Sequence, residues 1–243
     1  MSGSAPPTAV RNQLLAALPQ DVLASLMPKL LHIPLVLRDS LIVPDKTIEA
    51  VYFVESGWVS LVAALENGAQ AEVGLVGYEG MVGLPLILGV DTGFEEAFVQ
   101  APGAALRMEA GAFRRALEEI PILQTQLFRY SEAMHAQTTQ TAACNGHHAL
   151  EQRLARWLLM AHDRSDGDDL PLTQEFLAMM LCVYRPSLTV AAGILQREGI
   201  IRQGGRGQIT VLDRSALEAT ACDCYGAVQR RFSALLGPQS GTG

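Results

Sequence analysis

The stretch LTQEFLAMMLCVYRPSLTVAAGILQREGII (residues 172–201) decides the fold, because its apolar spacing predicts two short helices joined by a tight turn. Thr173 is placed to cap the first helix. The second helix is expected from about Tyr184 to Gly199, where glycine supplies a left-handed C-cap. The buried stripe of the first helix would be Leu177, Met180 and Leu181. This is the pattern of a helix-turn-helix.

The outward face of the second helix begins with one arginine and carries no acidic residue before Glu198. A helix that enters the major groove of DNA puts its first turn against the base edges, where Arg185 can make two bonds to guanine. Proline is tolerated at Pro186, because the N–H groups of a first helical turn have no intrahelical partner. Tyr184 and Ser187 can reach phosphate oxygens. The composition of this face therefore favours DNA readout.

A short hairpin is expected directly after these helices. IIRQGGRGQITVL (residues 200–212) predicts two strands around Gly204-Gly205, with an arginine on either side of the tip. In a winged helix such a hairpin lies beside the phosphates, whereas the alternative is an ordinary hairpin. The candidate DNA-binding residues are Thr173, Tyr184, Arg185, Pro186, Ser187, Thr189, Val190, Arg202 and Arg206.

Charge is distributed unevenly along the 243 residues, whose formal net charge is −7. Residues 1–145 hold 8 basic and 15 acidic residues, whereas residues 146–243 hold 10 of each, and all ten basic ones are arginine. Arginine is the side chain suited to bidentate contacts with phosphate and guanine. The acidic excess therefore argues against nucleic-acid binding only for the first part of the chain.

Residues 33–109 form short runs rich in Val, Ile, Tyr and Phe, at a spacing of roughly 8–12 residues that is typical of all-β domains. Asn67-Gly68 between two such runs is a strong hairpin signal. Pro102-Gly103 is expected to be a turn between two further strands. The pattern predicts an all-β sandwich or barrel.

A long helix is expected after the β-rich segment, ending at Asn145-Gly146. A heptad seam with alternating spacings of four and three runs along it at Leu123, Leu127, Tyr130, Met134, Gln137 and Thr141. We expect the four apolar members, Leu123, Leu127, Tyr130 and Met134, to pair with a second copy of the chain. The alternative is that this stripe packs against the β-rich domain of its own chain.

Three segments in this order resemble a transcription regulator of the Crp/Fnr family. IEAVYFVESGWVSLV (residues 48–62) and VGLVGYEGMVGLPLILG (residues 73–89) resemble the sensor domain of that family. Residues 173–201 align without a gap to its helix-turn-helix, and Arg185 matches its base-reading arginine. The resemblance covers nearly the whole chain.

The resemblance implies an α+β fold with three parts. These are an N-terminal β-barrel sensor domain (a jelly-roll-like double-stranded β-helix) over residues 11–115, a dimerisation helix over 116–145, and a winged helix-turn-helix over 146–220. It also implies a homodimer that binds a palindromic operator in double-stranded DNA, with RNA polymerase as a further partner. Pro186 and Val190 stand where relatives carry glutamate and a second arginine, so the operator should differ from the best-known palindromes. Val190 can contact a thymine methyl group.

The sensor segment departs from the cyclic-AMP-binding members of the family. Those members hold the ribose with a Gly-Glu pair and the cyclic phosphate with Arg-(Ser/Thr)-Ala. Here the first place reads Gly83-Leu84 and the second reads Glu95-Glu96-Ala97. Two carboxylates at the phosphate position would repel it. These five residues remain the candidate effector pocket, but we expect no cyclic AMP there in the usual mode and leave the effector unknown.

The four cysteines are Cys144, Cys182, Cys222 and Cys224. They do not match the N-terminal cysteine cluster with which some family members hold an iron–sulfur centre. Cys222-x-Cys224 has the form of a metal-ligand pair, but no histidine and no second cysteine pair lie nearby in the sequence. The sequence therefore predicts no metal site and no cofactor.

Two other function classes compete with DNA binding. An enzyme is disfavoured, because residues 33–109 contain neither cysteine nor histidine to act as a nucleophile or metal ligand. The remaining alternative is a small-molecule-binding module of the cyclic-nucleotide-binding type without direct DNA readout, against which Arg185 and the arginines of the hairpin argue. No apolar run reaches the roughly 20 residues of a membrane span, and no secretory signal is visible, so we expect a cytoplasmic protein without a membrane partner.

Overall fold

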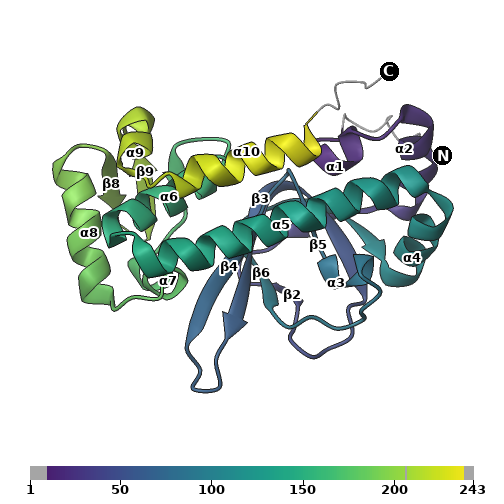
Figure 1. Ribbon diagram of the computed structural model, residues 1–243, viewed down its shortest axis with the longest axis horizontal. Helices are drawn as coiled ribbons and strands as arrows, with labels where there is room; N and C mark the ends of the chain where they lie inside the picture. Colours follow the sequence, from purple (N-terminus) through teal and green to yellow (C-terminus); the bar gives the residue numbers. More distant parts are fainter. Residues whose placement is uncertain (1–9, 206, 238–243) are drawn as a thin grey trace.

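The computed structural model describes residues 10–205 and 207–237, and it places a β-rich domain, a long helix and a small helical domain side by side (Figure 1). The chain begins with short helices, which are α1 (Gln13–Ala16), α2 (Gln20–Leu26) and the 3-10 helix η1 (Met27–Lys29). The strands of the β-rich domain are β1 (Leu31–Leu35), β2 (Ser40–Ile42), β3 (Ala50–Ala64), β4 (Gln70–Val76), β5 (Met81–Val82) and β6 (Glu96–Glu109). A one-turn helix, α3 (Leu84–Ile87), lies between β5 and β6.

These six strands form one antiparallel, jelly-roll-like sheet. Its order is β1-β6-β3-β4, with β2 paired to β6 and β5 paired to β3. The long strands β3 and β6 pair along most of their length, and register shifts around Ser56 and Trp58 let both strands bend. The hydrogen-bonded sheet does not close into a barrel, so the predicted β-rich sensor fold is confirmed as a curved sheet.

The two turn predictions in this domain had different outcomes. The hairpin at Asn67-Gly68 is confirmed, because it joins β3 to β4. The turn at Pro102-Gly103 is wrong, because both residues lie inside the continuous strand β6. A Cβ atom at position 103 would lie only 2.1 Å from the carbonyl oxygen of Ser56. The glycine therefore serves the close approach of β6 to β3 and not a chain reversal.

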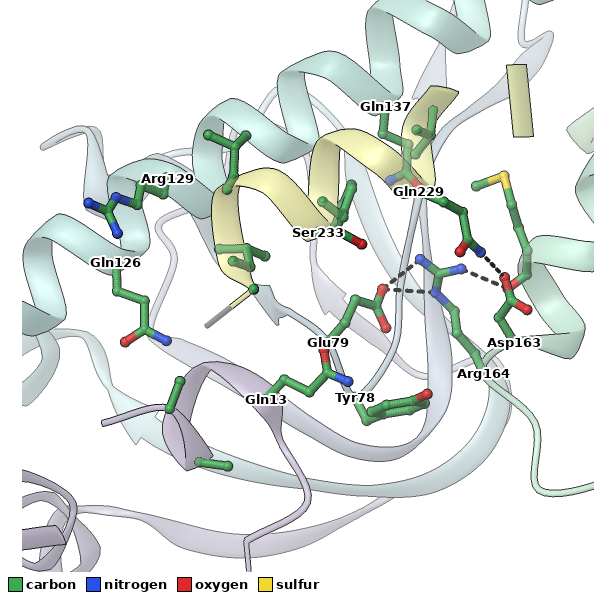
Figure 2. Close-up of a pocket in the computed structure, with 18 of the residues that line it drawn as sticks. Gln13, Tyr78, Glu79, Gln126, Arg129, Gln137, Asp163, Arg164, Gln229 and Ser233 are labelled. Atoms are coloured by element: carbon green, nitrogen blue, oxygen red, sulfur yellow. Dashed lines mark hydrogen bonds and ion pairs between the residues drawn. The ribbon is translucent and has the colours of Figure 1, made fainter. Parts of the chain in front are cut away.

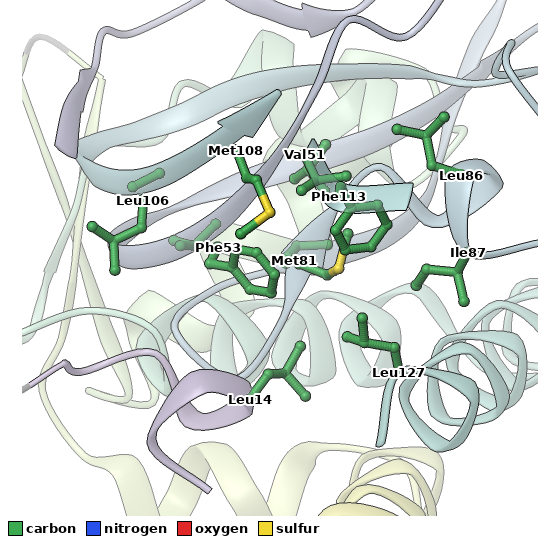
Figure 3. Packing of buried hydrophobic residues seen from close by; sticks show 14 of the residues in the cluster. Leu14, Val51, Phe53, Met81, Leu86, Ile87, Leu106, Met108, Phe113 and Leu127 are labelled. Carbon is green, nitrogen blue, oxygen red and sulfur yellow. The ribbon is translucent and has the colours of Figure 1, made fainter. Parts of the chain in front are cut away.

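The sensor core lies between the sheet and two helices, α4 (Ala110–Glu119) and α5 (Pro121–His147) (Figure 3). Phe53 of β3 and Phe113 of α4 meet edge to face with ring centroids 6.5 Å apart, and both are at most 1% exposed. Full burial of such a side chain contributes about 1.5–3 kcal/mol. Leu14 of α1 belongs to the same cluster, so the N-terminal helices close one side of the core.

The apolar seam of α5 faces its own domain. Leu123, Leu127, Tyr130 and Met134 are at most 3% exposed, and the Tyr130 hydroxyl donates to the carbonyl of Met81 at 2.9 Å. The prediction that these four residues form the dimer interface is therefore wrong, because the sensor domain already buries them. The heptad spacing identified a buried stripe correctly, but the spacing does not specify which surface covers it.

The helix also begins later than predicted. Pro121 occupies its first turn, and the residues from 110 to 119 form the separate helix α4. Proline is well placed in a first helical turn and poorly tolerated inside a helix, so it divides the two. The C-terminal end at His147 lies close to the predicted Asn145-Gly146.

The C-terminal domain contains the predicted winged helix-turn-helix. Its helices are α6 (Leu150–His162), α7 (Gln174–Met180), α8 (Arg185–Arg197) and α9 (Arg214–Thr220), and its strands are β7 (Asp169–Leu170), β8 (Ile201–Gly204) and β9 (Gln208–Val211). The left-handed φ of +73° at Gly199 confirms its expected conformation after α8. Within the described ranges no single helix is long and apolar enough to span a membrane; only α7 and α8 taken together pass by length and composition, across a 107° bend.

A final helix, α10 (Cys224–Leu236), was not anticipated from the sequence. It runs alongside α5 (Figure 1). Arg231 of α10 forms a 2.6 Å ion pair with Glu132 of α5, and Phe232 packs against the sensor core. The C-terminal helix thereby returns from the helix-turn-helix domain to the β-rich domain.

The sensor and the C-terminal domain share a second core. Trp58 and Leu75 of the sheet pack with the buried apolar residues of α6, α7 and α8. Phe176 of α7 meets Phe98 of β6 at 6.0 Å and Trp157 of α6 at 6.2 Å, both edge to face. The first helix of the helix-turn-helix is therefore docked on the sensor sheet.

Candidate nucleic-acid interface and sensor cavities

The first turn of α8 is presented to solvent. Tyr184 precedes the helix and is 86% exposed, and Arg185, Pro186 and Ser187 are all exposed. Further along the same face, Val190 is 63% exposed. The opposite face of the helix packs into the shared core through Leu188, Ala191, Ala192 and Leu195. Because that face is buried, the direction of the exposed side chains is fixed by packing.

Two threonines have structural roles in α7 and α8. Thr173 caps α7, because its Oγ1 accepts a hydrogen bond from the backbone N–H of Phe176 at 3.1 Å. Thr189 Oγ1 lies 3.0 Å from Gln174 Oε1, which joins the two helices. Thr173 is therefore first a structural cap, as predicted, although its residue remains exposed.

The wing lies directly beside these helices. The hairpin of β8 and β9 is extended by β7, which pairs with β9. The backbone N–H of Gln203 donates to the side chain of Gln196 on α8 at 3.3 Å. Arg202 is exposed on β8, whereas Arg206 lies outside the described residues. The wing and the first turn of α8 thus each carry an exposed arginine, Arg202 and Arg185.

The predicted effector pocket is almost completely filled. Gly83, Leu84, Glu95 and Ala97 come together there, but the cavity between them has a volume of only about 10 Å³. Glu96 is not part of it, since its carboxylate accepts a hydrogen bond from Ser40. About 10–15 Å³ is the room that one water needs, and small-molecule sites occupy about 300–1000 Å³.

Two residues show how closely this pocket is packed. Gly83 has a left-handed φ of +113°, and a Cβ atom there would lie 2.8 Å from a methyl group of Val51. Burial raises the pKa of the Glu95 carboxyl, because desolvation disfavours its charge. The pocket therefore resists a cyclic phosphate chiefly by steric exclusion, because its volume is only about 10 Å³.

A larger cavity, of about 1060 Å³, lies between α1, α5, α6 and α10 (Figure 2). Beside it, Arg164 Nη2 forms a 2.6 Å ion pair with Glu79 Oε1, and these side chains are only 9% and 14% exposed. Arg129 of α5 and Gln229 of α10 contribute to its walls. A ligand in this cavity would touch the sensor domain, the long helix and the C-terminal helix together.

A buried carboxyl group connects the sensor sheet to the C-terminal domain. Glu72 of β4 accepts hydrogen bonds from the indole N–H of Trp157 and, at 2.7 Å, from the Ser60 hydroxyl. Burial raises the pKa of Glu72 from 4.5 to about 8, and the two hydrogen bonds only partly oppose that rise. Sequence reasoning missed this contact, because Trp157 lies 85 residues from Glu72 along the chain.

Folding also assembles four side chains that sequence reasoning had set aside. The ligand atoms of Cys144, His148, Cys222 and Cys224 all lie within 4.8 Å of one another. The prediction of no metal site depended on the absence of a neighbouring histidine in the sequence, and the end of α5 supplies one from a distance. The detectable signal was the four-residue spacing of Cys144 and His148, which predicts one helical face.

Comparison with protein families identifies both domains. Residues 37–120 match the family model of the cyclic nucleotide-binding domain, and residues 152–220 match that of the Crp-like helix-turn-helix domain. The two matches together cover more than half of the chain. No curated protein matches the chain.

Solved structures share this arrangement at low sequence identity. FixK2 from Bradyrhizobium japonicum is 15% identical, with a TM-score of 0.64, covering 79% of this chain and 98% of that one. The c-di-GMP responsive global regulator CLP from Xanthomonas campestris is 17% identical, with a TM-score of 0.64 and coverage of 79% and 99%. A CRP-family transcriptional regulator from Thermus thermophilus is 20% identical, with a TM-score of 0.62 and coverage of 78% and 96%. These likenesses establish the shared fold.

Proposed function

This chain belongs to the Crp/Fnr family of DNA-binding transcription regulators, and from that premise we propose how it reads its operator. It acts as a homodimer that places α8 of each protomer in the major groove of a palindromic site. Arg185 reads guanine in each half-site. The observation that supports this most directly is the exposed first turn of α8, which carries Arg185 and is followed by no acidic residue before Glu198.

The remaining exposed residues position the protein on the DNA backbone. Tyr184, Ser187 and Arg202 are side chains of the kind that contact phosphate oxygens. Thr173, Thr189 and Arg206 complete the proposed interface. Val190 contacts a thymine methyl group. Pro186 contributes van der Waals contact and has no hydrogen-bond donor. Arg185 therefore carries most of the base-specific contacts of each half-site.

Dimerisation needs a different face of α5 from the one that the sequence suggested. Five of the exposed side chains of α5 recur at intervals of three, four or seven residues, and they are Thr125, Phe128, His135, Thr139 and Ala142. Such spacing keeps them on one side of a helix, where a second α5 can pack. Phe128, which is 47% exposed, supplies the largest apolar contact. RNA polymerase is a further partner that family membership suggests.

Selection of bound duplexes from a random DNA pool tests the operator and the dimer together. The expected product is a palindrome with a guanine in each half-site and centres about one helical turn, or 10 base pairs, apart. Affinity for the selected duplex should exceed that for random duplex and fall steeply with salt, because bound phosphates release counterions. A single unrepeated half-site, together with a monomeric mass in sedimentation, would contradict the homodimer. Equal affinity for selected and random duplex would contradict sequence-specific binding.

Cyclic AMP is not the effector in this proposal. Titration of the protein with cyclic AMP in a calorimeter should give only the heat of dilution, because the pocket between Gly83 and Ala97 has a volume of about 10 Å³. The matched control is the variant Glu95→Ala, which enlarges the same pocket without restoring the missing phosphate-binding arginine, and it should also give no heat. Saturable heat with the unaltered protein would overturn this part of the proposal.

A further inference from the structure

Four soft ligand side chains converge where the long helix ends. Cys144 lies in the last turn of α5 and His148 directly follows that helix, whereas Cys222 precedes α10 and Cys224 is its first residue. Cys144 Sγ lies 3.5 Å from Cys222 Sγ, and Cys224 Sγ lies 3.4 Å from His148 Nδ1. A tetrahedral ion bound at about 2.3 Å from sulfur separates its ligand atoms by about 3.8 Å. The four atoms therefore already have the spacing of a site for one ion.

We propose that Cys144, His148, Cys222 and Cys224 bind one zinc ion through three thiolates and one imidazole. Three sulfur atoms and one nitrogen form a soft ligand set, which favours zinc over magnesium or calcium. With all four positions taken by protein, the site is closed and its role is structural. An iron–sulfur cluster would place several metal atoms between its ligands, and these ligand atoms are too close together for that.

The histidine and one cysteine have the outer partners that metal ligands usually need. Asp223 Oδ1 lies 3.7 Å from His148 Nε2, the ring nitrogen that does not face Cys224 Sγ, and 3.9 Å from Cys224 Sγ itself. A carboxylate in this position orients a metal-binding imidazole and leaves Nδ1 free for the ion. Gln140 Nε2 lies 3.0 Å from Cys224 Sγ, where it can donate to a thiolate.

Charge and burial around the cluster also suit zinc. Three thiolates and one zinc ion carry a net charge of −1, which needs a cation nearby. Arg156 is 4% exposed and donates to Thr141 Oγ1 at 2.9 Å, one turn before Cys144 on α5. The three cysteines are at most 5% exposed, whereas the His148 side chain is 29% exposed and provides the edge by which an ion can enter.

The site would join three parts of the fold at one point. His148 lies between α5 and α6, where the long helix passes into the DNA-binding domain. Cys222 and Cys224 lie where the chain leaves α9 and starts α10. An ion here fixes the orientation of the DNA-binding domain relative to α5. It also holds the start of α10 against the end of α5.

Metal content measured on the reduced full-length protein tests the site. After incubation with zinc and removal of the excess, elemental analysis should give close to one zinc per chain. The double variant Cys222→Ser/Cys224→Ser should fall to nearly zero. The matched control is Cys182→Ser, which removes an exposed thiol in the turn of the helix-turn-helix and should keep one zinc. Equal zinc in all three proteins would overturn the proposal.

Cobalt titration of the unaltered protein gives a second measurement that does not depend on how a variant folds. One equivalent of cobalt should produce the absorption of a tetrahedral thiolate site, and one equivalent of zinc should remove it. The zinc site is wrong if the reduced protein takes up neither ion. It is also wrong if a non-reducing digest of the native protein shows a Cys144–Cys222 disulfide. Both measurements are independent of DNA, so failure of the operator proposal would leave them unchanged.

Discussion

Replacing Arg185 with alanine should abolish the preference of this protein for its selected operator while leaving its fold and dimer mass unchanged. A bidentate arginine–guanine contact contributes about 1–3 kcal/mol of discrimination, and a dimer uses it twice. A loss of about 2 kcal/mol already weakens the dissociation constant roughly 30-fold. Arg185 is exposed at the start of α8, so its removal should cost little stability. Competition binding against random duplex measures the effect.

Two further variants separate base reading from simple charge. Arg185→Lys keeps the positive charge but loses the planar pair of donors, so it should recover general affinity and not the operator preference. Arg202→Ala removes a proposed phosphate contact, so it should weaken operator and random duplex alike and lower the salt dependence by about one ion per protomer. If Arg185→Ala weakened both duplexes equally, Arg185 would be a backbone contact and not a reader.

The unaltered protein should lose stability as pH rises, and the replacement Glu72→Gln should abolish this pH dependence. The folded pKa of Glu72 is about 8, above the 4.5 of an unperturbed glutamate, so the folded state binds more protons than the unfolded state between these values. Protonated Glu72 therefore contributes its full stabilisation of the folded state below about pH 4.5. This contribution to the free energy of unfolding is lost as pH rises through 8. At about 1.4 kcal/mol per unit of pKa, the full loss is on the order of 5 kcal/mol.

Glutamine suits this site because it needs no proton to be neutral. Its amide oxygen can accept from Trp157, and its amide nitrogen can donate to Ser60. Urea denaturation should give similar stabilities for the two proteins near pH 5 and a clear advantage for Glu72→Gln near pH 9. The control is Glu66→Gln in the exposed hairpin, which should show no such divergence. A constant difference between Glu72→Gln and the unaltered protein at all pH values would contradict the assigned pKa.

The helix-turn-helix could be predicted in detail because its determinants are local. The capping role of Thr173, the inward face at Leu188 and Leu195, and the left-handed Gly199 depend on backbone geometry within a few residues. The same is true of the hairpin at Asn67-Gly68. Pro102-Gly103 misled the prediction, because its conformation is set by the close approach of another strand, which local propensity does not contain.

The sequence alone indicated a β-rich domain followed by a helix-turn-helix, and an arginine at the start of its second helix, since periodicity and capping are properties of neighbouring residues. Only the tertiary structure decided that the sensor sheet covers the seam from Leu123 to Met134, and that the pocket beside Leu84 is filled. It alone brought Cys222 to Cys144 and Cys224 to His148, across 78 and 76 residues. A repeating pattern predicts that a helix face is buried, and a residue type predicts that a metal ligand is available. Which surface covers that face, and which second ligand joins the first, is set by packing between residues far apart in the sequence.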